Sequence, residues 1–273
     1  MNSLPYKIGI NTIRGLGADE FDCMDVIKEA GFDAFFNEWS DGKDVGLFAK
    51  HAKELDLIYQ SVHAPFSGID CMWKEGERGD AFVDMLCRCA DDCEKSGIPV
   101  MIVHPFIGFF EHEPNELGVS RFLKVVDHAE KRGIVIAFEN VEGEEYLEAI
   151  MKATSSPYAK FCLDTGHEVC YNRSRDRLAL YGDRLAATHF NDNLGIRTTD
   201  GSITPNDDLH LVPFDGVVDW QNVMDRIKAH NYNGIITFEL KIKNGEEHKN
   251  YRNMTAAEYY KLAYDRAVRV ITL

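Results

Sequence analysis

The chain has 273 residues, enough for one large domain with a substantial buried core. Its formal net charge of −15 argues against a polyanionic partner such as DNA, which is bound through clustered lysines and arginines. No apolar run approaches the ~18 residues of a membrane span, and no basic stretch followed by an apolar one opens the chain. The seven cysteines lack CxxC spacing and are typical of free thiols. We therefore expect a cytoplasmic protein without a membrane partner.

Short apolar runs alternate with longer amphipathic stretches along the chain. Runs such as VMIVH and IVIAFE are almost continuously apolar, which is typical of strands buried on both faces of a parallel sheet. Helical patterns lie between the runs, at residues 19–30, 78–96, 120–132 and 220–230. The expected strands are Tyr6–Ile13, Phe32–Asn37, Leu57–His63, Pro99–His104, Gly133–Asn140, Lys160–Asp164, Ala186–Asn191 and Gly234–Leu240.

Eight strands that alternate with helices predict an α/β fold, a single-domain (β/α)8 TIM barrel over residues 1–273. The alternative is an open doubly wound sheet. Such a sheet would carry a glycine-rich phosphate loop after the first strand, and the full fingerprint is missing here. The longest irregular stretch, Asn193–Asp219, is too long for an idle connection and predicts a functional loop.

Imidazole and carboxylate side chains gather at the ends of the later strands and in this long loop. In a barrel, the carboxyl ends of all strands converge on one face, where active sites are built. Imidazoles and carboxylates that meet there favour a divalent transition-metal site. The candidate residues are His63, His104, Glu139, Asp164, His167, His189, Asp208, His210 and Glu239.

A single histidine at a strand end is more often a hydrogen-bonded structural residue than a ligand. The set favours a metal, because Glu139 and Glu239 both end strongly apolar strands, and buried acids are rare unless paired or metal-bound. The remaining histidines are interpreted as solvated surface residues: His51, His112, His128, His230 and His248.

Three further side chains are candidates for substrate binding. Trp73 could form one wall of a pocket, and Asn140 and Asn191 could bind hydroxyl groups. For Trp73 the alternative is ordinary packing. For the two asparagines it is hydrogen bonding within a turn or to a metal ligand.

The segments at the predicted strand ends resemble those of the xylose isomerase-like barrel superfamily. The similarity is greatest to its sugar phosphate isomerase/epimerase group, and endonuclease IV is a relative. Seven segments carry the resemblance in order between residues 62 and 240, each at a strand end or in the loop that follows. They are VHAPF, VHPF, FENVEG, CLDTGHEVCYN, HFNDN, DDLHLVPFDGVVDW and FEL.

The resemblance implies one metal held by Glu139, Asp164, His189 and Glu239, with zinc or manganese favoured and magnesium or cobalt as further candidates. It implies that His167 contacts substrate oxygens. Endonuclease IV uses further ligands for three zinc ions. The resemblance implies that the matching residues here bind additional metal ions or the substrate. These residues are His63, His104, His167, Asp208 and His210.

Some positions depart from the endonuclease-like pattern. Gly166 stands where that pattern has cysteine, Asn193 stands where it has serine, and the loop after His210 reads LVPFDG as in the sugar isomerase group. We therefore expect an isomerase or epimerase of a sugar, sugar phosphate or polyol that works through an enediolate. Glu139, Glu239 and His167 would be its catalytic residues.

Three alternatives to an isomerase or epimerase stay open: a dehydratase or lyase on the same scaffold, a zinc phosphodiesterase acting on abasic DNA, and a catalytically silent carbohydrate-binding barrel. The expected partner is a small sugar or sugar phosphate; the acidic balance disfavours nucleic acid. The sequence leaves self-association into a homo-oligomer open.

Overall fold

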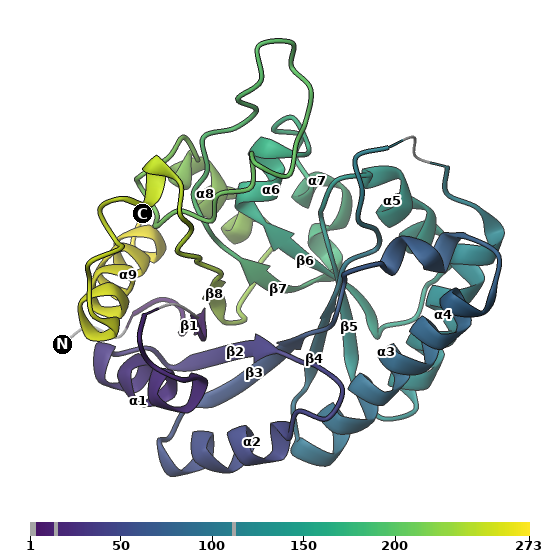
Figure 1. Cartoon of the computed structure of the whole chain (residues 1–273), viewed down its shortest axis with the longest axis horizontal. Helices are drawn as coiled ribbons and strands as arrows, with labels where there is room; N and C mark the ends of the chain where they lie inside the picture. Colours follow the sequence, from purple (N-terminus) through teal and green to yellow (C-terminus); the bar gives the residue numbers. More distant parts are fainter. Residues whose placement is uncertain (1–3, 14–15, 111–112) are drawn as a thin grey trace.

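A computed structural model describes residues 4–13, 16–110 and 113–273, so His112 lies outside the described residues. The strands form one parallel sheet in the order β7-β6-β5-β4-β3-β2-β1-β8, with the helices outside it (Figure 1). This confirms the predicted single-domain barrel. The strands are β1 (Ile8–Asn11), β2 (Ala34–Glu38), β3 (Ile58–His63), β4 (Val100–Val103), β5 (Val135–Glu139), β6 (Ala159–Asp164), β7 (Leu185–His189) and β8 (Ile236–Phe238).

The two edges of the sheet, β7 and β8, meet and close the barrel. Phe190 and Phe238 form a parallel bridge. The Phe190 N–H donates to the carbonyl of Thr237 over 2.8 Å, and the Glu239 N–H donates to the carbonyl of Phe190 over 3.1 Å. These bonds exclude the open doubly wound alternative, because such a sheet keeps two free edges.

Polar caps and apolar faces explain the outer helices. The side chain of Asp19 accepts a hydrogen bond from the Asp22 N–H at the start of α1, and left-handed Gly31 ends that helix. Each of the longer helices has buried apolar side chains at helical spacing, such as Cys23, Met24 and Ile27 in α1. The helices are α1 (Glu20–Ala30), α2 (Val45–Glu54), α3 (Glu77–Ser96), α4 (Glu116–Glu130), α5 (Glu144–Ala153), α6 (Thr165–Cys170), α7 (Leu178–Tyr181), α8 (Trp220–Ala229) and α9 (Ala256–Ile271), with single 3-10 turns at η1 (Ile69–Trp73), η2 (Gly182–Arg184) and η3 (Glu246–His248).

Several strands are shorter than predicted. The fourth was expected over Pro99–His104 and the eighth over Gly234–Leu240, whereas β4 and β8 keep only their central residues. The apolar residues continue beyond the last residue that is hydrogen-bonded to the neighbouring strands. Apolar composition therefore overestimates the length of a strand. His104 and Glu239 consequently lie just beyond their strands, at the rim of the barrel.

The long connection between β7 and α8 has neither helix nor strand, as the sequence predicted, and it rises above the barrel at the top of Figure 1. It is tied down through buried Asp192, whose carboxylate accepts hydrogen bonds from the N–H groups of Phe214 and Val218 and from the Trp220 indole. Within residues 4–13, 16–110 and 113–273, no helix combines the length and apolarity needed to cross a membrane.

Candidate metal centre

Four side chains meet where β5, β6, β7 and β8 end, and we call them the inner centre: Glu139, Asp164, His189 and Glu239. The first three are the last residues of their strands, and Glu239 follows β8 directly. Ladder register pairs Asp164 with His189, so the backbone itself brings these residues together. All four are buried, although three of them are acids, which indicates that a positive charge compensates them.

The geometry of the inner centre suits one cation. Each of the four residues offers a ligand atom, and these atoms all lie within 4.8 Å of one another. His189 Nδ1 is 3.3 Å from Glu139 Oε1 and 3.3 Å from Glu239 Oε2. Two ligands at about 2.1 Å from a tetrahedral ion would be separated by about 3.4 Å.

Hydrogen bonding inside the protein leaves several atoms of the inner centre unsatisfied. Both carboxylate oxygens of Glu139 and both ring nitrogens of His189 are buried without a hydrogen-bond partner. The ring of His189 is oriented by stacking on Phe36, with centroids 4.6 Å apart. Orphaned buried polar atoms are costly, and a divalent ion would satisfy them, so the residues present fit a metal.

Asn140 and Asn191 hold Asp164 in place. The Asn140 amide accepts from the Asp164 N–H over 2.7 Å and donates to the Asp164 carbonyl over 2.9 Å. The Asn191 amide donates to Asp164 Oδ2 over 2.8 Å, and Asn191 Oδ1 has no partner. Both asparagines thus orient a candidate ligand of the inner centre, which is the alternative that the sequence left open for them.

His63 and His104 approach Glu139 from the other side. Their Nε2 atoms lie 3.3 Å and 3.4 Å from Glu139 Oε2, whereas His189 faces Oε1. The structure therefore brings these two predicted residues to the same carboxylate. The Nδ1 atom of His63 contacts the carbonyl of Ala64 at 2.8 Å, which fixes its ring.

Three residues form a second group, which we call the outer cluster: His167 on α6, and Asp208 and His210 in the long loop. Their ligand atoms also lie within 4.8 Å of one another. His167 Nε2 is 3.6 Å from Asp208 Oδ1, and His210 Nε2 is 2.9 Å from the same oxygen. The outer cluster joins the inner centre through His210 Nδ1, which contacts the carbonyl of Glu239 at 3.0 Å.

Sequence reasoning missed two lysines beside these residues, Lys241 and Lys243. Lys241 Nζ lies 2.8 Å from His210 Nε2 and 3.5 Å from Glu239 Oε1. Lys243 Nζ donates to the backbone carbonyl of Asp208 and lies 3.6 Å from its Oδ2. Their spacing, two and four residues after Glu239, was the available signal, because alternate residues of an extended segment share one side.

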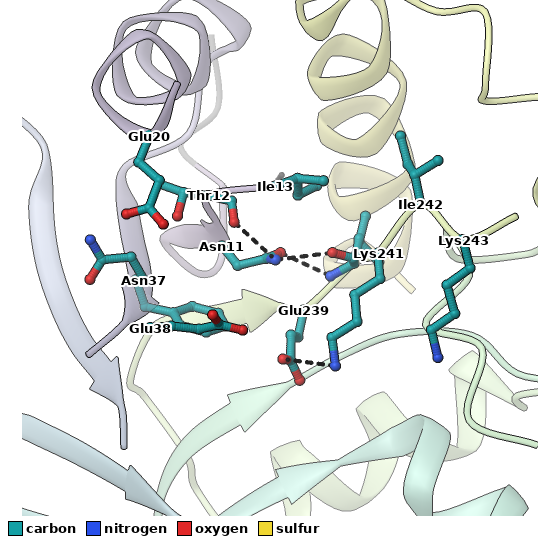
Figure 2. Close-up of a pocket in the computed structure, with 12 residues that line it drawn as sticks. Asn11, Thr12, Ile13, Glu20, Asn37, Glu38, Glu239, Lys241, Ile242 and Lys243 are labelled. Carbon is teal, nitrogen blue, oxygen red and sulfur yellow. Dashed lines mark hydrogen bonds and ion pairs between the residues drawn. The ribbon is translucent and has the colours of Figure 1, made fainter. Parts of the chain in front are cut away.

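A cavity of about 250 Å³ lies between the ends of β1, β2 and β8, beside the inner centre (Figure 2). Glu239 and Lys241 form one side of it, and Asn37 and Glu38 form the opposite side. Buried Asn37 Nδ2 has no hydrogen-bond partner. Polar lining of this kind can bind the hydroxyl groups of a small molecule.

Trp73 has the packing contacts of the alternative that the sequence left open for it. Trp73 packs against Phe122 and Tyr146, and its indole N–H donates to the carbonyl of Pro105 over 2.8 Å. The interpretation of His248 as a surface residue was wrong. The residue is fully buried on η3, where its ring contacts Tyr251.

The electrostatics of the inner centre depend on burial and on its neighbours. Burial lowers the pKa of His189, but the carboxylates of Glu139 and Glu239 outweigh it and raise that pKa to about 10. Burial is the main reason that the pKa of Asp164 rises to about 6. Burial lowers the pKa of His104 to about 4, so this imidazole is neutral and able to bind a metal at pH 7.

Known proteins resemble this chain over most of its length. The sequence profile described as xylose isomerase-like TIM barrel matches residues 24–259. The uncharacterised protein y4fM of Sinorhizobium fredii is 31% identical over 259 residues, which cover 90% of this chain and 76% of y4fM.

Two solved structures show the same fold at low sequence identity. The IolI protein with a bound zinc atom superposes with a TM-score of 0.78 at 17% identity, covering 97% of this chain and 98% of that chain. D-Psicose 3-epimerase with D-tagatose, from Clostridium cellulolyticum H10, superposes with a TM-score of 0.73 at 14% identity, covering 97% and 99%.

Proposed function

The chain belongs to the xylose isomerase-like TIM barrel family, and on that premise we propose that it is a metal-dependent isomerase or epimerase of a sugar, sugar phosphate or related polyol. The inner centre carries the proposal: four candidate ligand side chains from four successive strand ends, with both oxygens of Glu139 buried and without a hydrogen-bond partner. A sugar substrate is supported by the neighbouring structure of an epimerase with D-tagatose.

Glu139, Asp164, His189 and Glu239 would hold the metal, with zinc or manganese as the preferred ion. When bound, such an ion polarises a carbonyl and the neighbouring hydroxyl of a sugar, which acidifies the C–H bond of the hydroxyl-bearing carbon. Asn140 and Asn191 keep Asp164 in position for this role.

Glu139 and Glu239 are the proposed acid and base. Glu139 ends β5 and Glu239 directly follows β8, and these strands are three apart around an eight-stranded barrel, so the two carboxylates approach a bound substrate from different sides. One carboxylate would take the acidified proton and leave an enediolate, and the other would return a proton to the opposite face, as inversion requires. His167, whose Nε2 points toward Asp208, would orient a substrate oxygen.

The test is elemental analysis of the purified protein, followed by a screen of ketoses and their phosphates in deuterium oxide. We expect a bound divalent ion and an isomerised or epimerised product that carries deuterium at the reacting carbon. A product that has lost water would identify the dehydratase alternative instead. A protein that binds neither zinc nor manganese would contradict the proposal.

The phosphodiesterase alternative is favoured by one observation: His63, His104 and the outer cluster offer enough ligands for more than one ion. The net charge of −15 opposes it. We expect negligible binding of duplex DNA in a salt titration at physiological ionic strength. Efficient cleavage of a duplex with one abasic site would reverse this ranking.

A further inference from the structure

Glu239 differs from the other three candidate ligands of the inner centre in how its backbone is held. Each of the other three is the last residue of a strand, whereas β8 ends at Phe238, one residue before Glu239. The ladder between β1 and β8 ends with Ile10 paired to Phe238. Contacts other than this ladder must therefore hold the short segment that carries the Glu239 carboxylate.

The side chain of Asn11, the last residue of β1, makes such a contact. Its Oδ1 accepts a hydrogen bond from the Leu240 N–H over 2.9 Å, and its Nδ2 donates to the Leu240 carbonyl over 3.0 Å. The Nδ2 atom also donates to the carbonyl of Thr12 over 3.4 Å. Asn11 lies beside Glu239 in Figure 2, where dashed lines mark these bonds. One side chain thus binds both backbone polar groups of the residue directly after Glu239.

The two bonds to Leu240 define the orientation of the amide and the residue type that fits. A backbone N–H can only donate and a backbone carbonyl can only accept, so an amide turned by 180° would lose both bonds. Aspartate would have no donor for the carbonyl, and the hydroxyl of serine or threonine would be too short to reach both groups. Asn11 and Leu240 are buried, so little water is available to replace a lost bond.

Two further contacts hold the backbone of Glu239 itself. Its N–H donates to the carbonyl of Phe190 over 3.1 Å, and its carbonyl oxygen lies 3.0 Å from His210 Nδ1. Together with the bonds of Asn11, these contacts give a partner to each backbone polar group of Glu239 and Leu240. A shift of this segment would move the Glu239 carboxylate away from His189, whose Nδ1 lies 3.3 Å from Glu239 Oε2.

The same pair of bonds occurs at another strand end of the inner centre. Asn140 follows β5, and its amide binds both the N–H and the carbonyl of Asp164, over 2.7 Å and 2.9 Å. That amide acts on the backbone of a candidate ligand, whereas Asn11 acts on the residue that follows one. The recurrence of this arrangement at two separate strand ends supports a common role.

We propose that Asn11 is a positioning residue of the inner centre. Its amide continues the pairing of β1 with β8 past the end of β8 and thereby sets the Glu239 carboxylate where a divalent ion can bind it. This role rests on the proposed function, because the ion is that of the proposed metal centre.

Tyr260 on α9 provides a matched control at the same strand end. Its hydroxyl accepts from the Ile13 N–H over 2.8 Å and donates to the backbone carbonyl of Asn11 over 3.2 Å. Tyr260 therefore supports the backbone of Asn11, whereas the amide of Asn11 supports Leu240. Tyr260→Phe removes buried hydrogen bonds close to Asn11 and leaves the two bonds to Leu240 in place.

The test measures the zinc affinity of the intact protein by competition with a chromophoric chelator. Asn11→Ala should lower this affinity by about 10–100-fold, as the loss of a contact that orients a ligand typically does. Tyr260→Phe should leave it within about twofold. The melting temperatures of the metal-free proteins, measured alongside, separate a loss of affinity from a general loss of stability.

A double-mutant cycle tests whether Asn11 acts through Glu239. In a Glu239→Gln background, Asn11→Ala should change zinc affinity by no more than about twofold, because the side chain that Asn11 positions has already lost its charge. A residue that merely stabilised the barrel would lower the affinity by the same factor in both backgrounds.

Three results would overturn the proposal: an unchanged affinity in a folded Asn11→Ala, an equal loss in Tyr260→Phe, or the full further loss in the Glu239→Gln background. If Asn11→Ala does not fold, as judged by circular dichroism, Asn11→Thr takes its place, because threonine suits a strand. A wild-type protein that binds neither zinc nor manganese would refute the proposed metal-dependent function and this role with it. Wild-type-like affinity in Asn11→Ala would refute the role of Asn11 alone.

Discussion

The inner centre and the outer cluster are built from similar side chains but supported in different ways. Residues of the inner centre end four neighbouring strands, so the ladder of the barrel fixes their backbone. Residues of the outer cluster come from a short helix and a long loop, and side-chain contacts hold them. The oxygens of Glu139 in the inner centre have imidazole neighbours but no hydrogen-bond partner, whereas ammonium groups reach Asp208 and His210 in the outer cluster.

This difference shows how a barrel can reserve a position for an ion. A side chain on the last residue of a strand cannot easily reach other hydrogen-bond partners. Its polar atoms therefore lack hydrogen bonds unless a cation binds them. A loop can bring its own partners along the chain, as the segment 239–243 brings two lysines. We therefore expect metal dependence to be concentrated in the inner centre, and four experiments examine this contrast.

The largest effect is expected from Glu239→Gln. Glutamine keeps the shape of the side chain but loses the charge that accepts a proton and binds a cation. Turnover of a verified sugar substrate should fall by about 10³-fold or more, while the melting temperature of the metal-free protein changes little. Kinetic assays on both proteins test this, and wild-type-like turnover by the variant would show that Glu239 has no catalytic role.

A smaller effect should follow from Asn191→Ala, which removes the amide that donates to Asp164 Oδ2. Loss of such an orienting contact typically lowers metal affinity by about 10–100-fold. Competition with a chromophoric chelator measures this affinity. Asn222→Ala is the control, because Asn222 is exposed at the start of α8, where its backbone N–H donates to the side chain of Asp219. Equal affinity in the Asn191 and Asn222 variants would mean that Asp164 needs no support.

The order of apolar and polar residues along the chain was enough to predict the barrel and the position of its strand ends. The eight strands and the candidate ligands at their ends could be located because apolar runs end in His, Asp or Glu. That Asn140 and Asn191 contact Asp164 could not be predicted, because amides bind ligands and substrates equally well. The contact of Lys241 with His210 could not be predicted either, since it joins residues that lie 31 positions apart and depends on how the loop packs.

The pH dependence of metal binding distinguishes the inner centre further. The pKa of His189, about 10 without metal, means that its ring carries a proton at neutral pH and must release it to become a ligand. Affinity should therefore rise with pH, by about tenfold per unit between pH 6 and 8. Below pH 6 the fall should steepen, because Asp164, with a pKa of about 6, gains a proton as well. Chelator competition at several pH values tests this, and an affinity independent of pH would contradict it.

The smallest effect is expected in the loop that carries the outer cluster. Arg197 pairs with Glu247 and donates to the carbonyl of Asn206, which links the loop to η3. Arg197→Ala should increase hydrogen exchange of amides within 194–208 and lower the unfolding free energy by about 1 kcal/mol, because partly exposed ion pairs contribute little. Zinc affinity of the inner centre should stay within about twofold, since its ligands depend on the strands rather than on this loop. A tenfold loss of that affinity would show that loop and barrel act as one energetic unit, and the contrast between the two regions would then fail.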